Sequence, residues 1–207
     1  MTTTTTLERT ALKEWAVLCD AMARGDILAM VRKGGIREQR AGFTVRHDRF
    51  VLYPTYFHER ESELAPRFRR TLERSRVDQP PAGVIRVSLM ADVAAVWHVR
   101  ELEPLRAIEL EHGLAWDAVE SRFNYRGVAG VQVVAVRISR LPAVVDVPEA
   151  RRYQGCVSWV ELDADIDVRG AAAILGDANF EARMARMHDA LGEATAGEGM
   201  MHGGRDP

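Results

Sequence analysis

The sequence predicts a single α+β domain built on a mixed or antiparallel twisted sheet, with one helix near the N-terminus and another near the C-terminus. Two observations predict this class: β-branched and alternating runs occur in groups, and the amphipathic helical patterns lie between and outside these groups rather than after every strand. A chain of 207 residues and 23.1 kDa suits one domain with its own core. We assign this domain to residues 7–193 and expect residues 1–6 and 194–207 to be disordered tails.

The first half of the chain predicts two helices separated by strands. Residues 10–24 place apolar side chains on one helical face, and Thr10 and Gly25 are suitable residues to cap and to end this helix. Strands are expected over residues 27–31, 43–45 and 49–53. Pro54 cannot donate a ladder hydrogen bond, so it should lie at a strand end or an edge. Residues 62–77 predict an amphipathic surface helix with a strongly basic outer side.

The second half predicts further strands, short helices and a final helix. Strands are expected over residues 84–89, 93–99, 131–141 and 156–162, and short helices over residues 104–111 and 116–123. Pro142 and Pro148 are predicted to bracket a loop. The final helix, over residues 179–191, has an apolar face made of Phe180, Met184, Met187 and Leu191.

Composition excludes some classes and indicates where charge is concentrated. No apolar run approaches the roughly 18 residues of a membrane helix, and the threonine-rich start lacks the features of a signal peptide, so we expect a cytoplasmic protein without membrane partners. Residues 31–76 contain twelve Lys or Arg against six Asp or Glu, whereas residues 141–207 contain six against twelve. The basic segment favours a polyanionic partner, although the two charge sets could instead neutralise each other in the fold. Cys19 and Cys156 lie far apart and read as packed thiols rather than a disulfide.

The stretch VRKGGIREQRAGFTVRHDRFVLYPTYFHE, residues 31–59, is the strongest candidate for a binding site. Basic side chains that could contact phosphates alternate here with aromatic and histidine side chains on which unpaired bases could stack. Two adjacent glycines would allow backbone N–H groups to approach an anion, or would simply form a tight hairpin. Phe43, Phe50 and Tyr53 could alternatively fill the core. The predicted ligand-binding residues are Arg32, Lys33, Gly34, Gly35, Arg37, Arg46, Arg49, Tyr53 and Tyr56.

The leading function is therefore a nucleic-acid-associated binding or processing module, with DNA or RNA as partner. An alternative is a metal-dependent nuclease or other hydrolase, for which the candidate catalytic residues are Glu38, His47, His58 and Glu59. Its usual motif is absent, because Ala11 and Val31 occupy the positions two before the lysines. Neither a zinc motif nor a complete phosphate loop is present, so no cofactor is predicted, and a divalent metal is expected only under this alternative. A third possibility is that the protein is a non-catalytic regulatory or interaction protein, which would have an exposed apolar patch and no polar cleft.

Four ordered segments carry a resemblance to a known family. The segments LKEWAVLCDA, LAMVRKGGIRE, LYPTYFHE and YQGCVSWVEL resemble a bacterial family known as domain of unknown function 1802, over roughly residues 11–191. The resemblance implies no activity, cofactor or catalytic residue, but some relatives are joined to restriction-endonuclease-like domains, which points to a nucleic-acid or defence context. The order of elements is also similar to that of PUA-like and ASCH-like RNA-binding barrels, so a small barrel is one form that the sheet could take.

Overall fold

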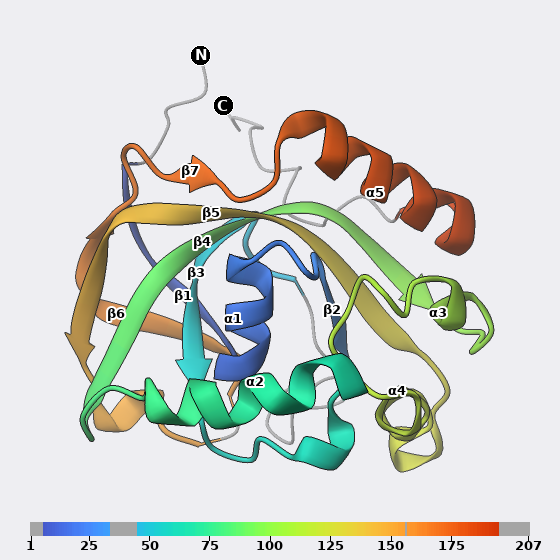
Figure 1. The fold of residues 1–207 in the computed structure, drawn as a ribbon, viewed down its shortest axis with the longest axis horizontal. Coiled ribbons are helices and arrows are strands. Elements are labelled where there is room, and N and C mark those ends of the chain that lie inside the picture. Colours follow the sequence, from blue (N-terminus) through green and yellow to red (C-terminus); the bar gives the residue numbers. More distant parts are fainter. Residues whose placement is uncertain (1–5, 34–44, 156, 195–207) are drawn as a thin grey trace, which may run out of the picture.

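A strongly curled mixed sheet forms the centre of the fold (Figure 1). The computed structural model describes residues 6–33, 45–155 and 157–194, and places seven strands in this sheet. The strands are β1 (Leu7–Trp15), β2 (Ala29–Arg32), β3 (Arg49–Thr55), β4 (Val84–Val99), β5 (Val131–Pro148), β6 (Trp159–Asp167) and β7 (Ala172–Ala173). The α-helices are α1 (Ala16–Ala23), α2 (Pro66–Val77), α3 (Pro104–Ala107), α4 (Trp116–Phe123) and α5 (Asp177–Leu191). Short 3-10 turns are η1 (Glu61–Glu63), η2 (Tyr125–Gly127) and η3 (Arg151–Tyr153).

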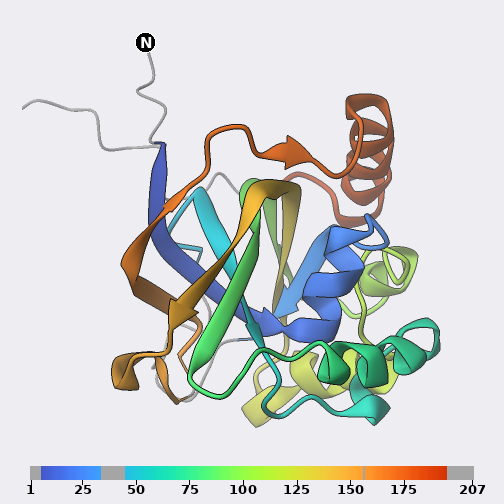
Figure 2. The ribbon, with the colours of Figure 1, turned by 60° about the vertical axis from the view of Figure 1, so that its left-hand side comes forward.

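The strand order confirms the predicted α+β class with a mixed sheet. The strands follow the order β2-β5-β4-β3-β1-β6, and β7 pairs with β5 beside this path. Neighbouring strands are antiparallel, with the exception of the parallel pair β1 and β3. Helix α1 lies in the hollow of the curled sheet, and α2 crosses below it (Figures 1 and 2). The expected helices near the two ends of the chain are α1 and α5.

The predicted N-terminal helix is too long, because residues 10–15 belong to strand β1. Helix α1 begins only at Ala16, so Thr10 does not cap it, whereas Gly25 does follow its end with a φ of 73°. Strand β1 pairs with β3 on one side and β6 on the other, and both Ala11 and Leu12 are fully buried. Consecutive buried residues hide the period of two that marks a strand with one buried face. The long-range pairing outweighs the weak strand propensity of this segment.

Two long strands replace what the sequence predicts as shorter pieces. Residues 84–99 form one strand, β4, with register shifts between Val87 and Leu89 and again between Val93 and Ala95. The loop expected between Pro142 and Pro148 is instead the second half of β5. Val87 pairs with Val145 and Leu89 with Arg140, so a bulge of several residues contains Pro142. A bulge is one of the places where a sheet accepts proline, because its N–H is not needed for the ladder.

The curl of the sheet divides the core into two parts. The larger cluster includes Leu12, Phe50 and Trp97, and it lies between the sheet and α1, α2, α4 and α5. The smaller cluster includes Tyr53 and Tyr153 and lies on the other face of β1 and β3, under the ends of β4, β5 and β6. Strands β1 and β3 are therefore buried on both faces. Their burial fixes the positions of the two segments that follow them, α1 after β1 and residues 56–60 after β3.

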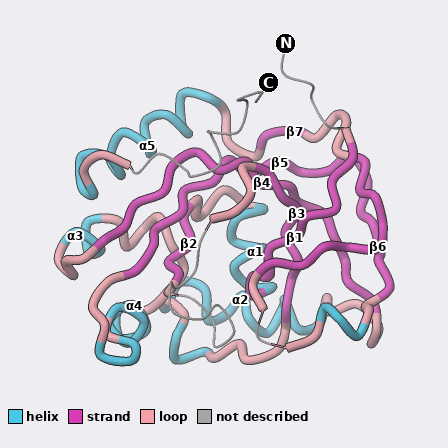
Figure 3. The backbone as a smooth tube through the Cα atoms, turned by 180° about the vertical axis from the view of Figure 1, so that it is seen from behind, coloured by secondary structure: helices cyan, strands magenta, loops and turns pink. Residues whose placement is uncertain are grey.

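The sheet remains open rather than closing into the small barrel that the sequence allows. Strands β2 and β6 are its two edges, and the described residues form no ladder between them (Figure 3). The exposed face of edge strand β6 carries Glu161, Asp163, Asp165 and Asp167. Charged side chains on an edge strand discourage pairing with another chain.

Most other predicted elements are confirmed within one to four residues at their ends. These are β2, β3, the basic helix α2, the short helices α3 and α4, part of β6, and α5 with its buried Phe180 and Met187. Pro54 lies near the end of β3, beyond its pairing with β4, as its missing N–H requires. Cys156, part of the predicted strand at residues 43–45, and all but residues 6 and 194 of the predicted tails at residues 1–6 and 194–207 lie outside the described residues. None of the helices in the described ranges is long and apolar enough to cross a membrane.

Candidate functional site

Arg32, one of the predicted ligand-binding residues, joins the edge strand β2 to β1. Its Nη2 donates to the Lys13 carbonyl at 2.6 Å and to Glu14 Oε2 at 2.9 Å. The Arg32 and Glu14 side chains are only 17% and 9% exposed. Glu14 also accepts the backbone N–H of Trp15 at 2.8 Å, so this ion pair fixes the junction between β1 and α1.

Lys33 directs its ammonium group inward, toward the segment that follows α4. Its Nζ donates to the carbonyl oxygens of Phe123 at 3.0 Å and Gly130 at 2.5 Å, and also to that of Val128. Three carbonyls match the three donors of an ammonium group. Burial lowers the pKa of Lys33. This lysine therefore holds the turn after α4 through its three donors.

Arg122 of α4, which sequence reasoning did not single out, completes the charged cluster under Arg32. It donates to the Val31 carbonyl at 3.1 Å, lies 3.6 Å from Glu63, and stacks 5.4 Å from the ring centre of Trp15. Burial lowers the pKa of the Arg122 guanidinium. The cluster therefore connects α4, β2, η1 and the start of α1.

The remaining described candidates of the predicted binding segment lie in different places. Arg49 pairs with Asp92 on neighbouring strand β4 at 2.6 Å. Tyr53 belongs to the smaller core cluster and donates its hydroxyl to Glu149 Oε1 at 3.0 Å. Burial raises the pKa of the Tyr53 hydroxyl. Arg46 is exposed on the segment that leads into β3.

The four candidate catalytic residues of the nuclease alternative do not share one described site. His47 is exposed and packs edge-on against Trp159 with ring centres 5.2 Å apart, whereas His58 and Glu59 follow the far end of β3. Within the described ranges there is no group of three His, Cys, Asp or Glu side chains placed to hold a metal ion. Glu38, together with the binding candidates Gly34, Gly35 and Arg37, lies outside the described residues.

Glu59 caps helix α1 from a distant part of the chain. The N-cap position, Trp15, provides no side-chain cap, and Glu59 Oε1 instead accepts the backbone N–H of Val17 at 3.0 Å. A carboxylate at this end also complements the helix dipole. The side chain is only 7% exposed, and Oε2 has no hydrogen-bond partner among the described residues. Burial raises the pKa of Glu59, an effect that the Val17 N–H bond only partly offsets, and burial also raises the pKa of nearby Tyr56 to about 12.

We predict that Glu59→Gln is at least as stable as the wild type at pH 7, because the neutral amide can accept the same N–H bond without burying a charge. A carboxyl whose pKa is raised by folding stabilises the protein most when protonated, so wild-type stability should fall relative to the Gln variant as the pH rises above about 4.5. Chemical denaturation from pH 4 to 7 measures this difference. Glu59→Ala is the control and should lose about 0.5–2 kcal/mol through loss of the cap. A Gln variant as unstable as the Ala variant at pH 7 would contradict the prediction.

Helix α2 presents the most basic exposed surface of a described helix. Its twelve residues include five arginines and one glutamate, while Phe68, Leu72 and Ser75 face the interior. The arginines are Arg67, Arg69, Arg70, Arg74 and Arg76, all exposed. The sequence predicts the basic side of this helix, but not which of its arginines form hydrogen bonds within the protein.

Three of these arginines donate hydrogen bonds to backbone carbonyls, and the other two lie at the centre of the outer face. Arg67 donates to the carbonyls of Glu109, Leu110 and His112, with the shortest distance 2.9 Å, and Arg76 donates to the Glu59 carbonyl at 3.3 Å. Arg69 donates to the Leu64 carbonyl at 3.4 Å. Arg70 and Arg74 lie opposite the buried stripe by helical spacing. That spacing is the signal by which the sequence could have singled out this pair.

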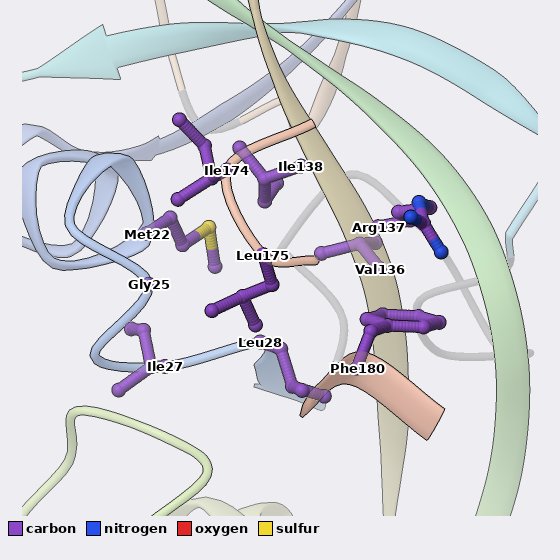
Figure 4. Close-up of a pocket in the computed structure, with 10 residues that line it drawn as sticks. All are labelled: Met22, Gly25, Ile27, Leu28, Val136, Arg137, Ile138, Ile174, Leu175 and Phe180. Carbon is purple, nitrogen blue, oxygen red and sulfur yellow. The ribbon is translucent and has the colours of Figure 1, made fainter. Parts of the chain in front are cut away.

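A small apolar cavity lies apart from these charged groups, where the end of α1 meets β5 and the start of α5 (Figure 4). It has room for about one water molecule. Gly25 borders it, and a Cβ at that position would come within 2.7 Å of Leu175 Cδ2. The one charged residue at its wall, Arg137, pairs with Asp177. The other lining side chains are apolar and Arg137 is already paired, so we do not place the functional site there.

The fold defines a single α+β domain with an open, curled mixed sheet and a basic helix on its surface. The sequence profile of the family described as Domain of unknown function (DUF1802) matches residues 11–186, and the chain therefore belongs to this family. Neither curated proteins nor solved structures gave a match to the chain.

Proposed function

We propose that the protein is a nucleic-acid-binding module whose main contact surface is the outer face of α2. The observation that carries the proposal is the row of arginines at positions 67, 70 and 74, which follow one another by three and four residues along an exposed helix. Guanidinium groups bind phosphate oxygens in a planar, two-pronged geometry, and they are the preferred side chains for this role. The proposal keeps the cytoplasmic, bacterial setting predicted from the sequence, in which both DNA and RNA are ligands within reach.

The arrangement carries an energetic cost that an anionic ligand would remove. Like charges at positions i and i+4 of a helix, such as Arg70 and Arg74, destabilise it by about 0.2–0.5 kcal/mol, and the single exposed Glu73 offsets only part of the repulsion among five arginines. The chain as a whole has a formal net charge of −2, so a general excess of positive charge does not account for this row. A polyanion whose phosphates lie along the helix would turn the repulsion into attraction.

The test is the double variant Arg70→Ala/Arg74→Ala, measured by fluorescence anisotropy with labelled DNA and RNA at several salt concentrations. Loss of two phosphate contacts should weaken binding on the order of tenfold near 0.1 M salt and reduce the slope of log K against log salt by about 1.4 for single strands or 1.8 for duplexes. Thermal stability should be unchanged or slightly raised, because both side chains are exposed and repel each other.

The matched control is Arg100→Ala/Arg169→Ala, which removes the same charge from exposed positions outside α2. Arg169 lies in the turn between β6 and β7, on the far side of the molecule from α2 (Figures 1 and 2). This variant should retain the wild-type affinity and salt slope. Equal losses in both variants would indicate attraction by overall charge and would contradict the proposed surface.

A further inference from the structure

Phe57 is an exposed aromatic side chain at the edge of the basic surface. It follows β3, and 76% of its surface is exposed. Its ring packs edge-on with that of His58, with centres 4.2 Å apart and an angle of 68° between the rings. A large apolar ring in water is unfavourable, and its edge-on neighbour leaves a flat ring face open to a partner.

The backbone holds this pair of rings in place through Glu59. His58 has a φ of 65°, which is an uncommon conformation for a residue with a side chain. The next residue is fixed at two points: the Glu59 carboxylate accepts the Val17 N–H, and the Glu59 carbonyl accepts a hydrogen bond from Arg76. Such conformations persist where the surrounding structure enforces them, and they are frequent at binding sites.

The same contact places the rings next to α2. Arg76 belongs to the C-terminal part of α2, and its 3.3 Å bond to Glu59 brings residues 57 and 58 to that end of the helix. In Figure 1 the segment that leaves β3 passes beneath α2 before η1. Phe57 and His58 therefore lie beside the Arg76 flank of α2, where a strand of nucleic acid that crosses the C-terminal part of the helix would reach them.

We infer that Phe57, supported by His58, is a stacking platform for an unpaired base, so that the ligand of the α2 surface is single-stranded DNA or RNA. This inference rests on the proposed function and names the substrate class of the same surface. Aromatic faces beside a basic track are the usual means by which proteins bind single strands without strict sequence preference. Bases within a duplex are stacked on each other and cannot offer a face to Phe57.

A base suits this surface better than an apolar partner does. Val77 is the one large hydrophobic side chain of the described residues that is strongly exposed on α2, and its exposed neighbours Glu73, Arg74, Arg76 and Asp78 are all charged. A membrane or a hydrophobic protein interface requires a continuous apolar patch, which one ring and one valine do not form. A nucleotide combines the flat face of its base with a phosphate for the adjacent arginine.

The experiment compares Phe57→Leu with Phe57→Trp, using short single-stranded DNA, single-stranded RNA and a duplex of the same sequence. The wild type should prefer both single strands to the duplex. Leucine retains an apolar side chain but lacks a ring face, so it should weaken single-strand binding by about 5- to 150-fold with an unchanged salt slope. Tryptophan should retain wild-type affinity. Circular dichroism and melting temperature check that both variants fold.

The possible results separate this inference from the proposed function. If the leucine and tryptophan variants bind single strands equally well while Arg70→Ala/Arg74→Ala weakens binding, the platform is wrong and the basic surface stands. A wild type that binds the duplex as tightly as the single strands also overturns the platform. If the arginine variant leaves affinity and salt slope unchanged, the proposed surface fails, and the inference fails with it.

Discussion

Arg183→Ala is expected to lower the free energy of unfolding by about 3–5 kcal/mol, because it removes the buried cation of the Glu111 carboxylate and leaves only the exposed Arg186 nearby. In the folded chain Arg183 Nε donates to Glu111 Oε2 at 2.7 Å, and the two side chains are 10% and 9% exposed. The same guanidinium donates to the carbonyls of Gly25 at 2.6 Å and Asp26 at 3.2 Å. One side chain of α5 thus connects this helix to the turn after α1 and to the segment after α3.

The control for this prediction is on the same helix and faces the same carboxylate. Arg186 lies 3.6 Å from Glu111 Oε1 but is 63% exposed, so Arg186→Ala should cost at most about 1 kcal/mol. The double variant Glu111→Leu/Arg183→Met removes both buried charges and should recover much of the loss. Urea denaturation of the four proteins measures these differences. Similar losses in Arg183→Ala and Arg186→Ala would contradict a special role for the buried pair.

Local patterns predicted α5 well but could not identify its main anchor. The helical spacing of Phe180 and Met187 follows from the sequence, and both are buried as expected. Arg183 occupies the same face, at a position where a charge needs a partner, but Glu111 lies 72 residues away in the chain. Because the sequence does not show that Glu111 is its partner, Arg183 would be assigned to the polar side of the helix.

Strand β1 is a second case in which the local sequence pattern is insufficient, because here it predicts the wrong secondary structure. Its spacing of apolar residues continues smoothly into α1, so periodicity alone joins the two elements into one helix. The partners that make residues 7–15 a strand are β3 and β6, one of which begins about 150 residues later. Pairing on both sides and burial on both faces are tertiary facts that a local pattern does not contain.

The sequence predicts that the candidate site is basic, but it does not predict which basic side chains lie on the surface and which form contacts within the protein. Arg32, Lys33 and Arg70 are all basic residues within the segment of high positive charge. The structure directs the first two to carbonyls and a carboxylate inside the fold, and leaves the third on the outer face of α2. Sequence composition gives the sign of a surface, whereas long-range contacts decide which side chains form it.

Arg32→Ala is the second change with a large expected effect, a loss of about 3–5 kcal/mol in the free energy of unfolding. The variant leaves Glu14, which is 9% exposed, as a buried carboxylate without its cation, and it removes the 2.6 Å bond to the Lys13 carbonyl that ties β2 to β1. Chemical denaturation measures the loss.

Arg49→Ala provides the matched comparison, because it breaks an ion pair that is shorter but less buried. Arg49 and Asp92 are 2.6 Å apart, against 2.9 Å for Arg32 and Glu14, yet their side chains are 36% and 33% exposed. If burial determines the cost of an unpaired charge, Arg49→Ala should lose only about 0.2–1 kcal/mol despite the shorter distance. Equal losses at the two sites, or a larger loss at Arg49, would show that burial does not determine the cost of the unpaired charge, and would contradict the proposed role of the Arg32–Glu14 pair in holding the edge of the sheet.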